Sequence, residues 1–253
     1  MRQAAPPRVE AAGSAGGIWP LTFDDVRFEV GGKALVDGLS LTLAAGARTV
    51  VMGPNGAGKS LFLRLLAGLL QPTAGRITYG GRAADAAALR RVAVVFQRPV
   101  MLRRSVAANL RHALATYGVP RAERARRIAE LLALAGLQHL ADRPARVLSG
   151  GEQQRLAMVR ALGAEPELLL LDEATASLDP QATAAIEDLI GQAAAKGVKI
   201  VMVTHDRGQA RRLADEVLFI HRGALAERCA ADVFFNRPNS AAAQAYLEGR
   251  LLL

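Results

Sequence analysis

The chain has 253 residues, 51% of them hydrophobic, with a formal net charge of +9 and one cysteine. This length and apolar content suit one large domain with a sizeable core. The lone Cys229 excludes an internal disulfide, and no run approaches the roughly 18–20 apolar residues that span a bilayer.

The first 20 residues are mainly Ala, Pro, Gly and Ser and contain no hydrophobic block. We expect a disordered leader over residues 1–20 and not a secretory signal. The strand patterns that follow, over 21–30 and 39–43, predict an antiparallel flank.

Residues 53–60 match the phosphate-loop pattern G-x-x-x-x-G-K-[ST]. The run 49–52 before them predicts a strand, and the run 61–67 after them predicts a helix. Glycines let such a loop turn its backbone N–H groups toward phosphate oxygens, and the helix adds its positive N-terminal end. The alternative is a glycine turn before a core helix. We expect a triphosphate to contact Gly53, Pro54, Asn55, Gly56, Ala57, Gly58, Lys59 and Ser60, with Mg²⁺ on the Ser60 hydroxyl.

A buried strand is predicted over 91–96 and leads into Gln97. From Arg98 to Arg127 there are eight arginines and one glutamate, so this segment carries +7 of the formal charge. It is either a solvated basic helix or a surface that meets anionic headgroups or an acidic membrane partner. Nucleic-acid binding is not expected, because only 4% of the residues are aromatic.

An amphipathic helix is predicted to begin at Pro120 and to stop at Gly136. Its core face consists of Ile128, Leu131, Leu132 and Ala135.

Ser149 and Glu152 have the spacing of a capping box at the start of a helix over 153–162. Gly150 and Gly151 between them leave backbone N–H groups uncovered, so this helix start can also hold an oxyanion. Ser149 follows Lys59 by ninety positions. One nucleotide can contact both helix starts if the helix start at Ser149 comes from a second subunit related by a two-fold axis.

Residues 168–171 are four leucines that precede Asp172 and Glu173. A continuous apolar run suits a strand covered on both faces, and open α/β sheets place ligands at the carboxyl ends of their strands. Beside a phosphate loop, Asp172 fits a Mg²⁺ partner and Glu173 fits a base for the attacking water. A solvated strand end is the alternative. A further apolar run over 198–203 precedes His205; a helix over 208–213 and a hairpin around Arg222 and Gly223 follow.

The order of these landmarks resembles that of the ATP-binding subunits of ABC transporters, from about Leu21 to Leu247. The resemblance rests on the phosphate loop, Gln97, LSGGEQ at 148–153, LLLLDE at 168–173, and the later residues Ser177, Leu178, Asp179 and His205. It implies an α/β fold with a P-loop NTPase (RecA-like) core, an antiparallel β flank and an inserted α-helical subdomain. We expect one ABC ATPase domain over 21–250, with its core at 21–97 and 165–250 and the helical subdomain at 98–164.

The resemblance also implies roles for these residues. Gln97 would sense Mg²⁺ or the attacking water and touch the membrane partner. His205 would contact the γ-phosphate and act in catalysis with Glu173. The ATP of the opposite subunit would be gripped by Ser149, Gly150 and Gly151, with Asp179 coupling the two sites. ATP and Mg²⁺ are thus the expected ligands, with Ser60, Gln97 and Asp172 around the metal.

Two positions depart from the family pattern. Val30 stands where family members usually stack an aromatic on adenine, so either Phe28 substitutes or the base packs on aliphatic surface. Ala174 stands where importers commonly carry proline, which favours an exporter.

The resemblance implies a peripheral ATPase on the cytoplasmic side of the cell membrane. Its partners would be a second ATPase subunit in a homodimer or pair, an integral-membrane permease and, through the permease, an extracytoplasmic substrate-binding protein. The loop 96–106, with Asn109 and Leu110 after it, resembles that of tungstate-type or phosphate-type oxyanion importers. Tungstate-like import is the first hypothesis, followed by phosphate or polar amino-acid import, then export. A soluble ABC ATPase acting on ribosomes or DNA and a catalytically dead binding module are the remaining alternatives.

Overall fold

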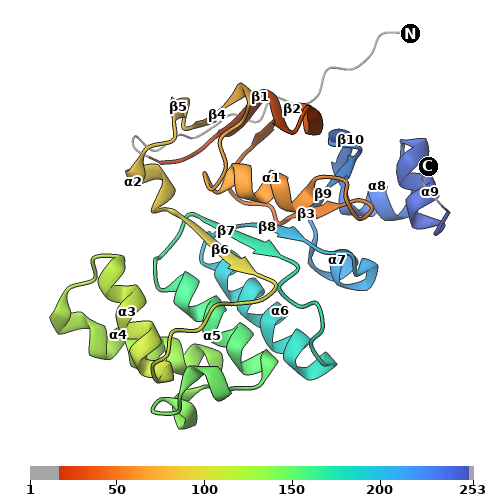
Figure 1. The fold of residues 1–253 in the computed structure, drawn as a ribbon. Coiled ribbons are helices and arrows are strands. Elements are labelled where there is room, and N and C mark those ends of the chain that lie inside the picture. Colours follow the sequence, from red (N-terminus) through yellow and green to blue (C-terminus); the bar gives the residue numbers. More distant parts are fainter. Residues whose placement is uncertain (1–16, 251–253) are drawn as a thin grey trace.

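The computed structural model describes residues 17–250, and its centre is a six-stranded sheet (Figure 1). The strand order is β10-β9-β3-β8-β7-β6, and all neighbours pair in parallel except β9 and β10. The strands are β3 (Thr49–Met52), β6 (Val92–Phe96), β7 (Leu168–Asp172), β8 (Lys199–Val203), β9 (Glu216–His221) and β10 (Ala224–Ala230).

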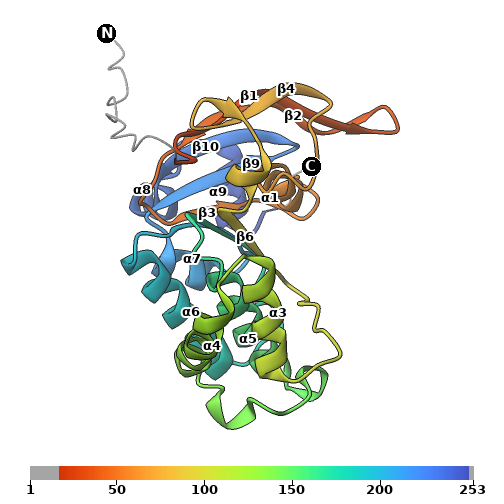
Figure 2. The same ribbon diagram turned by 90° about the vertical axis from the view of Figure 1, so that its left-hand side faces the viewer.

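A second, antiparallel sheet covers one face of the central sheet, with helix α1 between the two (Figures 1 and 2). Its order is β2-β1-β4-β5. The elements of this layer are β1 (Leu21–Val30), β2 (Lys33–Leu43), α1 (Lys59–Leu66), β4 (Ala74–Tyr79), β5 (Arg82–Ala83) and α2 (Ala86–Leu89). The antiparallel flank is present as predicted, although β2 begins six residues before the predicted start.

Helices cover the opposite face and extend below it as a lobe (Figure 2). They are α3 (Val106–Thr116), α4 (Arg121–Ala135), η1 (Gln138–Leu140), η2 (Ala145–Val147), α5 (Gly150–Leu162) and α6 (Pro180–Ala195). The chain then adds α7 (Arg207–Leu213), α8 (Ala231–Asn236) and α9 (Ala241–Leu247) beside β9 and β10.

The leucines of β7 show why its sequence has no polar alternation. Leu168 and Leu170 pack into the core on the antiparallel-sheet side, whereas Leu169 and Leu171 pack into the core on the helical side. All four are fully buried. Successive strand residues point to opposite faces, so a strand covered on both sides must be apolar throughout.

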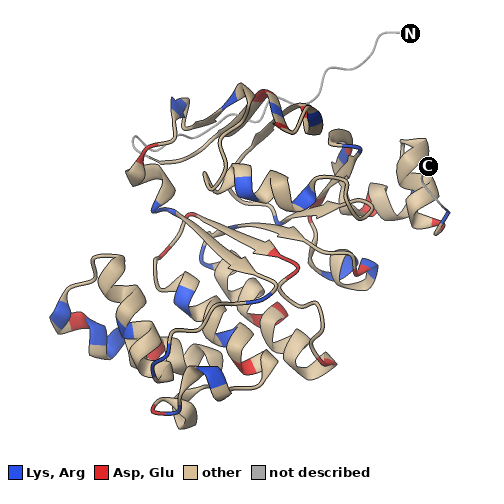
Figure 3. Ribbon diagram, viewed as in Figure 1, with Lys and Arg blue, Asp and Glu red and all other residues tan. Residues whose placement is uncertain are grey.

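Helix α4 follows its predicted pattern closely. Its buried residues are the four of the predicted core face, and Gly136 ends it in the left-handed conformation at φ 64°. Glycine is favoured there because it carries no Cβ that would clash in that conformation. Arginines gather on α4 and around its start, on the outer side of the lobe (Figure 3).

The expected leader over 1–20 is too long at its C-terminal end. Ile18 is 1% exposed and belongs to the core beneath the antiparallel sheet. Its backbone N–H donates to Glu167 Oε2 at 3.2 Å. Ile18 and Trp19 are two large apolar residues at the end of the expected leader. Both pack against the core, so the chain has a defined position from Ile18 onward. Residues 1–16 of the expected leader lie outside the described residues.

Several elements have no counterpart in the sequence predictions, among them α3, α6, α8 and α9. Over residues 17–250, no helix combines the length and the apolar character that crossing a bilayer requires.

Candidate functional site

The predicted residues meet at the carboxyl ends of three neighbouring strands. In the sheet register, Phe96 on β6 pairs with Asp172 on β7, and Asp172 pairs with Val203 on β8. Gln97, Glu173 and His205 follow these strand ends directly or one residue later. The parallel register thus brings side chains that are far apart in the sequence to one edge of the sheet.

The phosphate loop is packed so tightly that two of its positions admit only glycine. A Cβ on Gly53 would lie 2.0 Å from the Ile220 carbonyl oxygen, and one on Gly58 would lie 2.9 Å from the Leu35 carbonyl oxygen. Both glycines have positive φ, at 149° and 101°. The loop is also tied to the β9–β10 turn, because the Gly223 N–H donates to the Ala57 carbonyl at 3.0 Å. The sequence predicted that turn but not its contact with the loop.

Lys59 is buried at 6% exposure inside this loop. Its ammonium donates to the carbonyls of Gly53 and Pro54, each at 2.9 Å. Burial lowers the pKa of Lys59, and the negative charges of Glu173 and Asp172 partly offset that effect. The ammonium is therefore held by its own loop, within electrostatic reach of the two carboxylates at the end of β7.

Ser60 and Asp172 form the part of the site that suits a divalent cation. The Ser60 hydroxyl donates to Asp172 Oδ1 at 2.9 Å. Burial raises the pKa of Asp172 despite that hydrogen bond, and the neighbouring Glu173 raises it further. Mg²⁺ prefers oxygen ligands such as a hydroxyl and a carboxylate, and the negative charge of Asp172 is not fully stabilised by its neighbours. These two residues therefore fit the expected ion. Among residues 17–250, no group of three or more His, Cys, Asp or Glu side chains forms a metal site.

Glu173 and His205 lie next to each other at the same edge. His205 Nδ1 is 3.4 Å from Glu173 Oε2, and the Glu173 N–H donates to the Val203 carbonyl at 3.0 Å. The His205 side chain is 59% exposed and the Glu173 side chain 23%. Glu173 adopts a left-handed backbone conformation (φ 51°), which is costly for a residue with a side chain and is often found at functional sites.

The second predicted oxyanion site stands at the start of α5. The predicted capping box is present: Ser149 Oγ accepts from the Glu152 N–H at 3.3 Å, and Glu152 Oε2 accepts from the Ser149 N–H at 2.7 Å. Helix α5 lies on the helical side of the sheet, whereas α1 and the phosphate loop lie on the other side (Figure 1). Within residues 17–250, no hydrogen bond or ion pair joins residues 149–151 to the phosphate loop.

Gln97 shares a cavity with residues at the start of α5 and before α6. It lines a cavity of about 320 Å³ together with Gly150, Ser177 and Leu178. Asp179 is the N-cap of α6, where its Oδ1 accepts the Ala182 N–H at 2.7 Å. Asp179 therefore has a structural role in the protomer besides any role toward a partner.

One residue beside the site was missed in the sequence. Gln154 is 2% exposed, and its Nε2 donates to the Phe96 carbonyl at 3.2 Å. It thereby links α5 to the residue that precedes Gln97. The signal available in the sequence was weak, because a glutamine in the first turns of a helix is ordinary.

The residues considered for the adenine contact lie at the outer end of β1. Val30 is 58% exposed at the turn into β2, and Phe28 is partly buried against the core beneath the antiparallel sheet.

Comparison with known proteins matches this architecture to one family. The sequence model described as ABC transporter matches residues 36–176. A solved structure described as the ATP-binding subunit of an ABC transporter superposes with a TM-score of 0.79 and 28% identity, covering 90% of this chain and 98% of that one. The cbiO1 structure from Clostridium perfringens, part of the complex cbiONQ, superposes with a TM-score of 0.78 and 27% identity, covering 88% and 92%.

Curated relatives are import subunits for different solutes. The methionine import ATP-binding protein MetN of Brucella abortus (strain 2308) is 40% identical over 88% of this chain, which spans only 63% of that relative. The tungstate uptake system ATP-binding protein TupC of Peptoclostridium acidaminophilum is 37% identical, over 85% of this chain and 99% of the relative. The phosphate import ATP-binding protein PstB 2 of Natronomonas pharaonis is 35% identical, over 87% and 84%.

Proposed function

The chain belongs to the ABC transporter family of ATP-binding ATPase subunits, and we propose that it hydrolyses ATP to drive transport through a separate membrane protein. The observation that carries this proposal is the meeting of Lys59, Ser60 and the Asp172–Glu173 pair at one edge of the sheet, with His205 beside Glu173. A phosphate-binding loop, a magnesium ligand set and a base are the parts that NTP hydrolysis requires.

Each residue has a distinct part in the proposed reaction. Backbone N–H groups of 53–60 and the Lys59 ammonium hold the β- and γ-phosphates, because both present positive charge to them. Ser60 and Asp172 would hold Mg²⁺, which would supply positive charge next to the phosphates. Glu173 orients the attacking water and accepts its proton. His205 holds Glu173 in position through the 3.4 Å contact and reaches the γ-phosphate from its exposed side.

We propose that a second copy of the chain completes the site. Ser149 and Gly150 are exposed at the start of α5, and they lie on the other side of the sheet from their own phosphate loop. A two-fold partner presents the same helix start to the opposite nucleotide, so two ATP molecules are bound between two subunits. Asp179 stands at the start of α6, and the residue before it, Leu178, lies next to Gly150. Asp179 is therefore suited to couple the two sites.

The surface after β6 is the proposed contact with the membrane protein. Phe96 is 40% exposed and Val100 is 74% exposed, on both sides of Gln97. We propose that the membrane protein covers these two exposed apolar side chains. Gln97 and the two residues after it share a cavity with Gly150 at the start of α5. Because the start of α5 contacts the ATP of the opposite subunit in this proposal, closure of the two subunits also moves the surface that the permease contacts. We propose that this contact holds the subunit at the cytoplasmic face of the cell membrane.

For the transported solute we propose an oxyanion such as tungstate. The resemblance of the loop 96–106 and the 37% identity to the tungstate uptake subunit support it. Phosphate import and amino-acid import are the alternatives, supported by the relatives for phosphate and methionine. All these relatives are import subunits, which favours import over the export that Ala174 favoured. The test is to reconstitute the complex with its receptor and measure which solute stimulates ATP hydrolysis.

The hydrolytic role is tested with Glu173→Gln, which keeps the size of the side chain and removes the base. This variant is expected to bind ATP and form a stable dimer while releasing phosphate about a thousand-fold more slowly. The matched control is Glu123→Gln on the exposed side of α4, which should release phosphate at the wild-type rate. Wild-type turnover in Glu173→Gln would refute the assignment of the base.

A further inference from the structure

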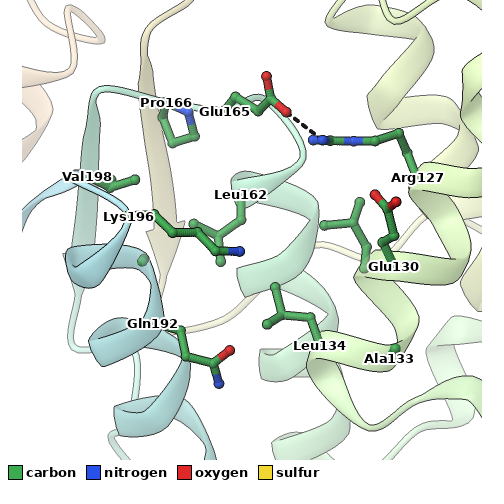
Figure 4. Close-up of a pocket in the computed structure, with 12 residues that line it drawn as sticks. Arg127, Glu130, Ala133, Leu134, Leu162, Glu165, Pro166, Gln192, Lys196 and Val198 are labelled. Atoms are coloured by element: carbon green, nitrogen blue, oxygen red, sulfur yellow. Dashed lines mark ion pairs between the residues drawn. The ribbon is translucent and has the colours of Figure 1, made fainter.

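A cavity of about 650 Å³ lies between helices α4, α5 and α6 (Figure 4). Its walls are α4 and the end of α5 on one side, and the end of α6 on the other. Pro166 and Val198, which stand just before β7 and β8, also line it. The cavity therefore lies at the amino ends of the strands, and the proposed ATP site lies at their carboxyl ends.

The lining combines an apolar floor with a charged rim. Leucines 131, 134 and 162 and Pro166 form much of the wall. On the rim, Arg127 Nη1 is 2.5 Å from Glu165 Oε1, so these two charges compensate each other. Glu130, also on the rim, accepts from Arg126 Nη1 at 2.6 Å. A volume of this size with a mainly apolar wall is typical of sites for small organic ligands.

Lys196 is the charge on this rim that has no compensating partner. Among residues 17–250, no hydrogen bond or ion pair engages its ammonium. Figure 4 shows its side chain extended toward Leu162, among the residues that line the cavity. An unpaired cation over an apolar wall favours a ligand that is both anionic and largely apolar.

We propose that this cavity binds a free medium-chain carboxylate, with the carboxylate on Lys196 and the hydrocarbon chain against the leucines. A cationic ligand is disfavoured, because both rim carboxylates are already paired with arginines. Inorganic anions are disfavoured as well, because they would leave the leucine wall exposed to water. This inference is independent of the proposed ATPase function.

The position of the cavity gives ligand binding a structural consequence. A bound chain contacts α4 and α5 of the helical lobe and α6 beneath the sheet at the same time. Binding to the folded protein alone stabilises it by mass action. The carboxylate is therefore expected to raise the thermal midpoint of the full chain with or without nucleotide.

The test uses isothermal titration of the full chain with decanoate below its micelle concentration. Decanoate should bind, and decanol, which lacks the charge, should bind about five-fold more weakly. Lys196→Gln should weaken decanoate binding by about five-fold and leave decanol unchanged. The matched control is Lys33→Gln, at an exposed lysine on β2, which should bind as the wild type does.

A second variant tests the cavity itself. Ala133→Phe places a ring at the cavity wall on α4 and should abolish binding of both decanoate and decanol. Circular dichroism of the variants and their ATP hydrolysis report independently that the fold is retained. The proposal is overturned by the absence of decanoate binding, by equal binding of decanoate and decanol, or by unchanged decanoate affinity in Lys196→Gln.

Discussion

His205 Nδ1 lies 3.4 Å from Glu173 Oε2, although the two residues are on different loops that follow β7 and β8. The parallel pairing of Asp172 with Val203 sets this distance, because each side chain comes shortly after its paired residue. The pair forms the edge of a cavity of about 210 Å³ that Thr204 and Asp206 also line. The proposed base and the residue proposed to hold it in place are thus adjacent in the structure.

The first prediction is that Glu173 and His205 act as one unit. His205→Ala and Glu173→Gln should each lower the rate of phosphate release by about 100- to 1,000-fold, and the double variant should be no slower than the worse single variant. The measurement is steady-state phosphate release at saturating ATP. Losses that multiply in the double variant would show that the two residues act separately.

The second prediction concerns the buried carboxylate of Asp172. Its pKa is raised by burial, so its charged form destabilises the folded chain without a cation. Asp172→Asn removes that charge, and its amide oxygen still accepts from Ser60. The thermal midpoint without nucleotide should rise by roughly 2–4 °C, the effect of about 1 kcal/mol in a chain of this size.

The sign of the pH dependence follows from the raised pKa. A carboxyl that is protonated more readily in the folded state favours folding at low pH, fully so below its ordinary value of 3.8. The advantage of Asp172→Asn should therefore shrink as the pH falls through the raised value. The variant should also lose the Mg²⁺ dependence of ATP binding. An unchanged thermal midpoint at neutral pH would contradict the prediction.

The third prediction separates packing from ligand contact at the start of α5. A Cβ on Gly150 would meet nothing closer than the Leu178 side chain at 3.9 Å, whereas one on Gly151 would lie 2.7 Å from the Ala182 side chain. Gly150→Ala should therefore keep the stability of the protomer and lose ATP-dependent dimerisation and most hydrolysis. Gly151→Ala should destabilise the protomer itself by about 1–3 kcal/mol. Chemical unfolding and sizing with ATP measure the two effects, and wild-type dimerisation of Gly150→Ala would contradict the proposed partner contact.

The fourth prediction is a loss of stability in acid that depends on Glu227. This carboxylate is 7% exposed and accepts from the N–H groups of Asn239 and Ser240 at 2.8 and 2.9 Å, which fixes the chain between α8 and α9. Burial alone would raise its pKa, but these hydrogen bonds outweigh burial and lower it below 4.5. Its stabilising effect is therefore complete above that value and is lost as the pH falls through the lowered one.

Glu227→Gln should destabilise the chain by about 2 kcal/mol at neutral pH, because a neutral amide oxygen accepts these bonds less strongly. The difference from the wild type should shrink in acid, where Glu227 itself becomes protonated. Urea unfolding over a pH series measures it, with the exposed Glu123→Gln as the control that shows no such trend. A difference that stays constant with pH would contradict the prediction.

Features that depend on neighbours in the sequence were predictable. The strand before the phosphate loop, the core face of α4 and the capping box at Ser149 depend on residues within one or two helical turns or on a short run along one strand. The chemistry of Lys59, Ser60, Asp172 and Glu173 was predictable for the same reason, because each belongs to a short segment with fixed spacing. The strand order, by contrast, was not predicted.

The sequence by itself indicated which residues we propose to bind phosphate and magnesium, because backbone geometry and side-chain chemistry in the phosphate loop and at the end of β7 are local properties. Only the tertiary structure decided that Gly223 supports the loop, that Gln154 holds the end of β6, and that Ile18 is part of the core. Those contacts join segments separated by more than fifty positions, and no local pattern records them. The same holds for the cavity beside Lys196, because residues from three helices that are separate in the sequence form its walls.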